Sequence, residues 1–395
     1  MFSLFIIKIK NLIVFLISIL IIILLKFQKT TTHLHTLLLI RLDEIGDFVL
    51  FCNFISAVKA SQKYQAYRIS LCGNELWRDL AEHFFRHEIH SFIWIQKTKF
   101  YSNLFYKYRI LKQIYQAGFE VVINSRYSRG ILYDDLIVRA SRAPITIGSE
   151  GSLEKHAQWK RHLFTDRYYT RLIPQSGEVN FEFLRNKYFF EKILEEPISL
   201  RKPALKQIKE IPFQLPERYI ILFPGAGEIK REWAVEKFAQ LGKFILQKYN
   251  IPIVLCGSPK DLEKSQQIDK ILNNNNTYNL AGKTSLPELI SIIANSELLI
   301  SNDTSAPHIT AAVNRPFICI SNGKTLGRFS PYPKEVFAGS SYIYPPQIMN
   351  NLHEMDKLKE QYQFDSDLAI NEITVDQVKI LVAEILEKKL KGYTF

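Results

Sequence analysis

Both halves of the chain carry the same rhythm, in which short apolar runs alternate with stretches whose apolar residues recur at helical spacing. The short runs are typical of buried strands, and the helical spacing is typical of amphipathic helices. Because consecutive parallel strands must be joined by a crossover, this alternation predicts parallel sheets covered by helices. The expected strands are 36–40, 68–72, 91–95, 119–124 and 144–147 in the first half, and 219–223, 251–256, 277–280, 298–301 and 317–321 in the second.

A proline-rich segment divides the chain. Residues 196–216 contain four prolines, and we interpret them as a linker between two Rossmann-like α/β domains at 36–195 and 217–373. The closing segment, 374–395, opens with a Thr-x-x-Gln capping box, which predicts a helix. With 395 residues, of which 47% are hydrophobic, the chain can bury two cores.

The N-terminal segment is strongly apolar. Leu12 to Leu25 are apolar apart from Ser18, and lysines flank the run on both sides. Such a run covers roughly 21 Å as a helix, and flanking turns could extend it toward the roughly 30 Å of a bilayer core. No small-residue cleavage site follows it. We therefore expect residues 1–30 to be a retained membrane anchor, either a thin span or a segment lying in the interface.

The net charge of +12 predicts an anionic neighbour, which could be nucleic acid, an anionic membrane surface or a phosphorylated substrate. Residues 149–176 concentrate basic and aromatic side chains, among them Lys160 and Arg161. This stretch could stack on single-stranded nucleic acid, hold a phosphorylated glycolipid or line a cleft. The four cysteines are far apart in apolar contexts, which indicates buried thiols in a reducing compartment.

A glycine-rich turn follows the strand expected at 219–223. Gly225 and Gly227 would let backbone amides approach an anion, and Lys230 and Arg231 add two cations beside them. A diphosphate would fit at such a turn, which lies where open α/β sheets bind ligands. An ordinary turn with a solvated Lys-Arg pair is the alternative.

Two further strand ends carry candidate side chains. After the strand 298–301, the sequence Asn-Asp-Thr precedes a helix with proline in its first turn, whose free amides would attract an anion. Asp303 would repel phosphate, so it caps the helix or accepts a hydrogen bond from a sugar hydroxyl, while Thr304 and the amides meet a diphosphate. His308 is either a packed first-turn residue or a ligand. After the strand 36–40, Asp47 is either a helix cap or a functional carboxylate.

These motifs together resemble glycosyltransferase family 9, the heptosyltransferases. The resemblance rests on Ile-Arg-Leu-x-x-Ile-Gly-Asp at 40–47, on Pro-Gly-Ala through Lys-Arg-x-Trp at 224–233, and on Leu-Ala-Gly-Lys-Thr-Ser-Leu at 280–286 with Asn-Asp-Thr to His at 302–308. It implies the GT-B architecture, in which two Rossmann-like domains face each other across a cleft and the closing helix packs back on the first domain. It also implies an inverting enzyme that needs neither metal nor cofactor.

The resemblance further implies the partners and the site. The donor would be ADP-heptose or a similar nucleotide diphosphate sugar, and the acceptor a lipid-linked or lipopolysaccharide core glycan at the cytoplasmic face of a bacterial inner membrane, with no role for nucleic acid. By position, Asp47 is the catalytic base. The donor residues would be Gly225, Ala226, Lys230 and Arg231 at the glycine turn, Thr284 by the nucleobase, and Asp303, Thr304, Ser305 and His308 by the sugar diphosphate. We assign Arg41, Lys160 and Arg161 to the acceptor.

The sequence departs from the family pattern in places. Ser305-Ala306 replaces a glycine-containing turn, Asn-Gly-Lys-Thr at 322–325 replaces Gly-Pro-Thr, and the long N-terminal segment is untypical. A metal-dependent reading would rest on Asp365-Ser366-Asp367, which lies outside any expected strand end. The alternatives from other classes are a membrane-tethered nucleic-acid binder and a non-catalytic glycan-binding relative. The presence of Asp47 argues against the second.

Overall fold

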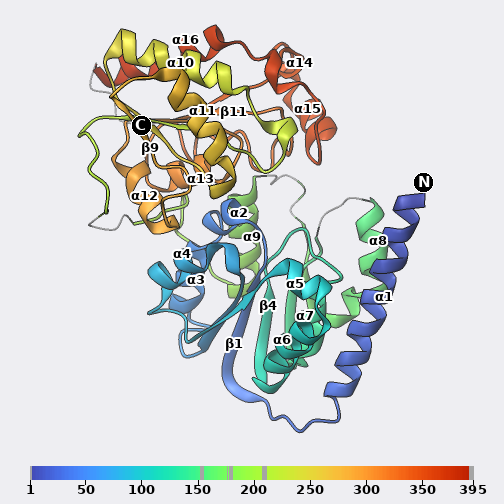
Figure 1. Cartoon of the computed structure of the whole chain (residues 1–395). Helices are drawn as coiled ribbons and strands as arrows, with labels where there is room; N and C mark the ends of the chain where they lie inside the picture. Colours follow the sequence, from blue (N-terminus) through green and yellow to red (C-terminus); the bar gives the residue numbers. More distant parts are fainter. Residues whose placement is uncertain (1, 152–154, 176, 178–180, 207–210, 391–395) are drawn as a thin grey trace. The chain divides into compact units, whose positions relative to one another are not determined.

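The computed structural model describes residues 2–151, 155–175, 177, 181–206 and 211–390. The chain forms two compact units. The first contains Met1–Phe48, Phe54–Glu178 and Arg185–Ser199, and the second contains Val49–Asn53, Val179–Leu184 and Leu200–Phe395. Each unit is built around one parallel sheet, as the alternating pattern predicts (Figure 1).

The first sheet has the strand order β3-β2-β1-β4-β5-β6, and each neighbouring pair is parallel. Leu38 of the central strand lies opposite Ser70 on one side and Val122 on the other. Leu37 to Ile40 are fully buried, because helices cover both faces of this strand. The strands are β1 (His33–Arg41), β2 (Arg68–Asn74), β3 (Ser91–Ile95), β4 (Phe119–Asn124), β5 (Ile145–Ser149) and β6 (Arg171–Ile173).

Nine α-helices are described in the N-terminal half of the chain. Their bounds are α1 (Phe2–Leu25), α2 (Ile45–Val49), α3 (Asn53–Ala60), α4 (Arg78–Phe85), α5 (Lys97–Ser102), α6 (Leu104–Gln116), α7 (Asp134–Ser141), α8 (Lys155–Phe164) and α9 (Glu182–Leu194). The pattern of apolar residues did not predict α8, since its basic and aromatic residues lack a clear apolar stripe. The short edge strand β6 was also missed.

The predicted N-terminal membrane anchor is wrong. Helix α1 packs along the outer side of the first unit, and Ile21, Ile22 and Leu25 belong to that unit's core (Figure 1). The ammonium of the buried Lys107 on α6 donates to Ser18 Oγ at 2.9 Å. Of the helices formed by the described residues, none has the combination of length and hydrophobicity that crossing a bilayer demands. The predicted location, at the cytoplasmic face of an inner membrane and anchored by this segment, is wrong for the same reason.

The second sheet has the strand order β12-β11-β10-β7-β8-β9, again with parallel neighbours. Taken from β9 to β12, with β7 counted as strand 1, the order is 3-2-1-4-5-6, the same as in the first sheet. This is the strand order of dinucleotide-binding folds. The strands are β7 (Ile220–Phe223), β8 (Ile253–Leu255), β9 (Thr277–Asn279), β10 (Leu298–Asn302), β11 (Phe317–Ile320) and β12 (Ser340–Ile343). Two Rossmann-like domains are therefore present, as predicted.

The helices of the second unit pack on both faces of this sheet. They are α10 (Val235–Tyr249), α11 (Leu262–Leu272), α12 (Leu286–Asn295), α13 (Ser305–Ala312), α14 (Pro346–Met349), α15 (Met355–Tyr362) and α16 (Val375–Leu390). Val378 and Val382 of α16 are fully buried in the core of the second unit, where the helix contacts α10 and β11. The sequence-based expectation placed this closing helix on the first domain instead.

Candidate active site

Three of the segments that carry candidate residues lie where the strand order of a sheet reverses. In the first sheet the reversal falls between β1 and β4, and in the second between β7 and β10. Open α/β sheets bind ligands outside the carboxyl ends of their strands at such points. The Arg41–Asp47 segment follows β1, the glycine turn follows β7, and the Asp303–His308 segment follows β10. The topology therefore places these three segments where a ligand is expected, whereas the segment that contains Thr284 follows the edge strand β9.

Arg41 organises the candidate site of the first unit. Its side chain is fully buried, and Nη1 donates to the Ser125 carbonyl at 3.2 Å and to Asn186 Oδ1 at 3.1 Å. Its Nε lies 2.9 Å from Asp43 Oδ2. The guanidinium of Arg41 is thus enclosed by protein groups, and its predicted contact with an acceptor stays a prediction.

Asp47, the predicted base, lies on the short helix α2. Its Oδ1 is 3.8 Å from Nη2 of Arg41, and 17% of its side chain is exposed. A partly exposed carboxylate with a fixed cation behind it can accept a proton from a hydroxyl that approaches from solvent. Two neighbouring acids are more strongly engaged. Asp43 pairs with both Arg41 and Arg126, and Glu44 pairs with Lys97 at 2.7 Å.

Sequence reasoning missed a buried ionic network beside this carboxylate. Arg126, just after β4, joins Asp43 to Asp134, whose Oδ1 accepts from Arg126 Nη1 at 2.6 Å. Burial lowers the pKa of Arg126, but Asp134 and Asp43 outweigh that effect and raise it overall. Asp134 also accepts from Asn124 at 3.0 Å. Asp134 is fully buried, because the first turn of α7 faces the sheet end.

The network continues through Asp135, which is fully buried as well. Burial raises its pKa, although the charge of Arg129, 3.6 Å away, opposes that effect. Tyr169 donates to Asp135 Oδ1 at 2.6 Å, and its ring lies 4.6 Å from the Arg129 guanidinium carbon. Arg129 also pairs with Asp166. The signal in the sequence was an Asp-Asp pair at a helix start, opposite a strand end rich in arginine.

The two predicted acceptor cations on α8 differ in exposure. Lys160 is exposed, whereas Arg161 is 2% exposed. A Cβ on Gly151, which has a φ of +86°, would lie 3.1 Å from the guanidinium carbon of Arg161. The glycine therefore makes room for this buried side chain.

In the second unit, the backbone of the glycine turn after β7 passes close to the side chain of Asp261. A Cβ on Gly225 would lie 2.2 Å from the carboxyl carbon of Asp261. Asp261 is itself fixed, since its Oδ2 accepts from the Ser258 amide at 2.8 Å and from the Ser258 hydroxyl at 2.7 Å. The turn can approach Asp261 this closely only with glycine at 225. Ala226 is half-buried and the following residues are exposed.

Lys230 projects from this turn and already has anionic partners. Its ammonium donates to Asp365 at 2.9 Å and to Asp367 at 3.0 Å. These hydrogen bonds, that with Asp365 first, raise the pKa of Lys230. Lys324 pairs with Glu228 at 2.6 Å and lies 3.5 Å from Asp365. The Asp365-Ser366-Asp367 segment, which had suggested a metal site, thus forms ion pairs with the predicted phosphate-binding lysine.

Arg231 links the two strand ends of the second site. Its Nη2 donates to the Asp303 carbonyl at 2.5 Å and lies 3.2 Å from Asp303 Oδ2. The same carboxylate oxygen accepts from Ser321 Oγ at 3.2 Å. Asn302, fully buried, donates to the Pro224 carbonyl at 2.6 Å and accepts from the Trp233 amide at 3.1 Å. The structure therefore brings together Arg231 and Asp303, and the two motifs that carry them.

The remaining donor candidates surround the start of α13. Thr304 caps this helix, because its hydroxyl accepts from the Ala306 amide at 3.2 Å, and Ser305 is half-buried in the first turn. His308 is 5% exposed, and its Nδ1 is 3.0 Å from the Tyr332 hydroxyl. Burial lowers the pKa of His308 to about 4, so the imidazole is neutral at pH 7. Thr284 lies in the turn after β9, two strands away from β7.

Comparison with known proteins identifies relatives of this chain. The model of glycosyltransferase family 9 (heptosyltransferase) matches residues 108–359. Lipopolysaccharide heptosyltransferase 3 of Escherichia coli K12 is 24% identical over 64% of this chain and 72% of its own length. Lipooligosaccharide heptosyltransferase 2 of Haemophilus influenzae is 37% identical, over 32% of this chain and 38% of its own length. The chain thus spans about two fifths of that relative.

Solved structures show the same fold. A family 9 glycosyl transferase from Veillonella parvula superposes with a TM-score of 0.66 at 15% identity, over 91% of this chain and 99% of that one. The E. coli heptosyltransferase WaaC, solved with ADP, gives a TM-score of 0.65 at 16% identity, over 89% of this chain and 99% of that one. Because the family model covers well over half of the sequence, the chain belongs to glycosyltransferase family 9, the heptosyltransferase family.

Proposed function

We propose that this protein transfers a heptose or a similar sugar from a nucleotide diphosphate donor, ADP-heptose or a close analogue, to a lipopolysaccharide core or other lipid-linked glycan. The observation that carries the proposal is the placement of a partly exposed carboxylate, that of Asp47, at the switch point of the first sheet, and of two cations, Lys230 and Arg231, at the switch point of the second. The net charge of +12 would also be consistent with binding of nucleic acid. Membership of the heptosyltransferase family favours sugar transfer instead.

The proposed mechanism is a single displacement with inversion at the anomeric carbon. Asp47 takes the proton of the acceptor hydroxyl, and Arg41 holds the Asp47 carboxylate in place from behind. General-base catalysis of this kind typically contributes about 10² to 10⁴ in rate. The donor diphosphate is received at the second switch point, where Arg231, Lys230 and the first amides of α13 stabilise the charge that develops on the leaving group. Charge neutralisation by these groups is the reason to propose that no metal is needed.

His308 and Asp303 have separate parts in this proposal. The neutral imidazole packs behind the start of α13 and contributes no charge to the diphosphate. The Asp303 carboxylate is held by Arg231 and Ser321, so it orients the arginine and can accept a hydrogen bond from a sugar hydroxyl. The assignment of Thr284 to a position beside the nucleobase rests only on the resemblance of its motif to that of family 9.

The decisive experiment replaces Asp47 with asparagine. Asn preserves a polar side chain of the same shape but cannot accept a proton from a hydroxyl at neutral pH. We expect Asp47→Asn to leave the melting temperature and ADP affinity near those of the parent, while sugar transfer falls by about two to four orders of magnitude. Asp356→Asn, at an exposed site on α15, is the control. Transfer by Asp47→Asn within a few-fold of the parent would remove Asp47 from the mechanism.

The stereochemistry and the metal requirement are tested on the same reaction. The anomeric configuration of the product, read by proton NMR, should be opposite to that of the donor. The rate should persist when a chelator is present in excess. Retention of configuration, or loss of transfer that added Mg²⁺ restores, would contradict the single displacement without metal.

A further inference from the structure

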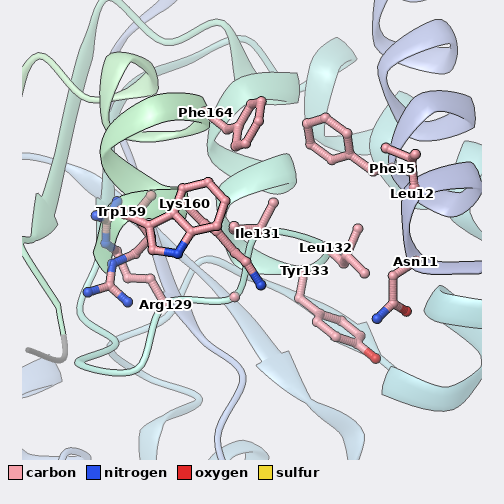
Figure 2. A pocket seen from close by; sticks show the side chains of 12 residues that line it. Asn11, Leu12, Phe15, Arg129, Ile131, Leu132, Tyr133, Trp159, Lys160 and Phe164 are labelled. Atoms are coloured by element: carbon pink, nitrogen blue, oxygen red, sulfur yellow. The ribbon is translucent and has the colours of Figure 1, made fainter. Parts of the chain in front are cut away.

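A pocket of about 590 Å³ lies on the first unit, between α1, the loop 129–133 and α8. Its volume is within the roughly 300 to 1,000 Å³ of small-molecule sites. Figure 2 shows Trp159 and Phe164 on one side, Leu12 and Phe15 of α1 on the other, and Ile131 and Leu132 between them. The walls are therefore made by aromatic and aliphatic side chains from three separate segments.

These apolar side chains are accessible. Leu12 is 57% exposed, Trp159 is 54% exposed and Phe164 is 38% exposed. Side-chain contacts nevertheless hold the walls of the pocket together, because the rings of Phe15 and Phe164 pack edge-on with their centroids 6.2 Å apart. The Tyr101 hydroxyl donates to Asn11 Oδ1 at 2.5 Å and fixes α1 beside the rim.

The polar lining of the pocket is cationic. Arg129, Lys160 and Arg161 all line it, and Lys160 is the exposed member of the three. Burial lowers the pKa of Arg161, and the charge of the nearby Arg129 lowers it further. An anion bound at this end would oppose the repulsion between the two guanidinium groups, on both of which the carboxylates of Asp135 and Asp166 already act.

Together these features select one class of ligand. A hydrocarbon chain brings no polar group to the apolar walls, whereas a peptide would bring amides that the walls cannot satisfy. An anionic group at the head of that chain would meet the cations. We propose that the pocket binds one hydrocarbon chain of an anionic lipid, with its phosphate or carboxylate head at Arg129, Lys160 and Arg161.

The lipid is assigned to the acceptor, and this part of the inference rests on the proposed function. Arg129 follows β4 and Asp47 follows β1, so both lie beyond the carboxyl edge of the same parallel sheet. Ion pairs connect them through the adjacent Asp135 and Asp134, then Arg126, Asp43 and Arg41. A chain held in the pocket would anchor the acceptor on the side of the sheet that carries the base.

Binding of the chain is tested without any transfer reaction. Dodecyl phosphate below its micelle concentration is titrated into the full-length protein and followed by calorimetry and tryptophan emission. We expect saturable binding with a blue shift of Trp159 emission, and no binding of inorganic phosphate alone at the same concentrations. Leu12→Asp should weaken binding about tenfold or more, since it places a charge against the chain.

The controls match the variants in exposure and charge. Ile380→Asp, on α16 at 60% exposure, should leave the affinity unchanged. Lys160→Glu should weaken binding of dodecyl phosphate more than binding of dodecyl maltoside, because only the phosphate head is charged. The control Lys357→Glu, at an exposed site on α15, should affect the two affinities equally. No binding of dodecyl phosphate, or equal affinities for Leu12→Asp and Ile380→Asp, would overturn the pocket assignment.

A second arm tests the origin of the lipid. With an acylated acceptor and its acyl-free form as substrates, Leu12→Asp should raise the ratio of their KM values, and Ile380→Asp should not. An unchanged ratio, with dodecyl phosphate binding lost, would overturn the assignment to the acceptor. Absence of transfer with either acceptor would refute the proposed function, while the binding titration would still decide on the pocket.

Discussion

His308 makes the stability of the second unit depend on pH. Burial, the largest influence, lowers its pKa from 6.5 to about 4, and the charge of Arg231 acts in the same direction. The folded protein therefore binds this proton less well than the unfolded chain does. The stabilisation is complete above pH 6.5 and is lost as the pH falls toward 4.

The size of the effect follows from the two pKa values. At pH 5 the unfolded histidine is almost fully protonated and the folded one is mostly neutral, which corresponds to a loss of about 2 kcal/mol relative to pH 7. His308→Gln keeps a side chain that can hydrogen-bond to Tyr332 but does not titrate. Its unfolding free energy should fall by about 2 kcal/mol less than that of the parent between pH 7 and pH 5.

The assay must separate the two units, because a two-unit chain need not unfold in one step. Urea unfolding followed by fluorine NMR of protein labelled with 5-fluorotryptophan does so, since Trp233 lies in the second unit and Trp77, Trp94 and Trp159 lie in the first. His353→Gln, at an exposed site, controls for the loss of a histidine. Equal losses of stability in the parent and in His308→Gln, read at Trp233, would refute the buried neutral imidazole.

Three further predictions concern other contacts. Gly225→Ala should destabilise the second unit by about 1 to 3 kcal/mol in urea, since its Cβ would overlap Asp261; the exposed Gly227→Ala should cost less, and equal costs would contradict the close approach. The double variant Asp365→Asn/Asp367→Asn should bind ADP several-fold more tightly in calorimetry, because it frees the Lys230 ammonium from its two carboxylate partners. Lys230→Ala should weaken ADP binding about tenfold or more, and unchanged affinities in both variants would remove Lys230 from the donor site. Burial lowers the pKa of Lys107 to about 8, so the first unit should gain stability from pH 8 to 10.5, and Lys107→Met should abolish that gain; a gain that survives would place its origin elsewhere.

The sequence was most informative where local patterns decide the structure. Leu37 to Ile40 form an uninterrupted apolar run, which is typical of a strand buried on both faces of a parallel sheet. The positions of Asp47, Lys230 and Asp303 followed, because residues just after such strands share one edge of the sheet. From the sequence, Gly225 was predicted to let the backbone come close to a ligand. In the structure, the group that lies close to it is the carboxylate of Asp261.

The misses arose from contacts between distant segments. Apolar composition alone could not distinguish a bilayer from a protein surface as the partner of α1, and only the packing of Ile22 and Leu25 decides that question. The network of Asp134 and Asp135 joins α7 to arginines that follow β4, and no spacing rule connects them. Likewise, Asp365 reaches Lys230 across 135 residues of sequence.

The ion pairs of Lys230 also affect how donor binding would respond to ionic strength. The attraction between an anion and a solvated ammonium is screened by the small ions that gather around both, so the affinity of the anion falls as salt is added. At Lys230 the place of those counterions is taken by Asp365 and Asp367, which are part of the protein. An incoming diphosphate therefore exchanges with tethered carboxylates whose local concentration does not change with the buffer. Its affinity should vary less with salt than the positive charge of the chain would suggest, and it should vary more steeply once both carboxylates are removed.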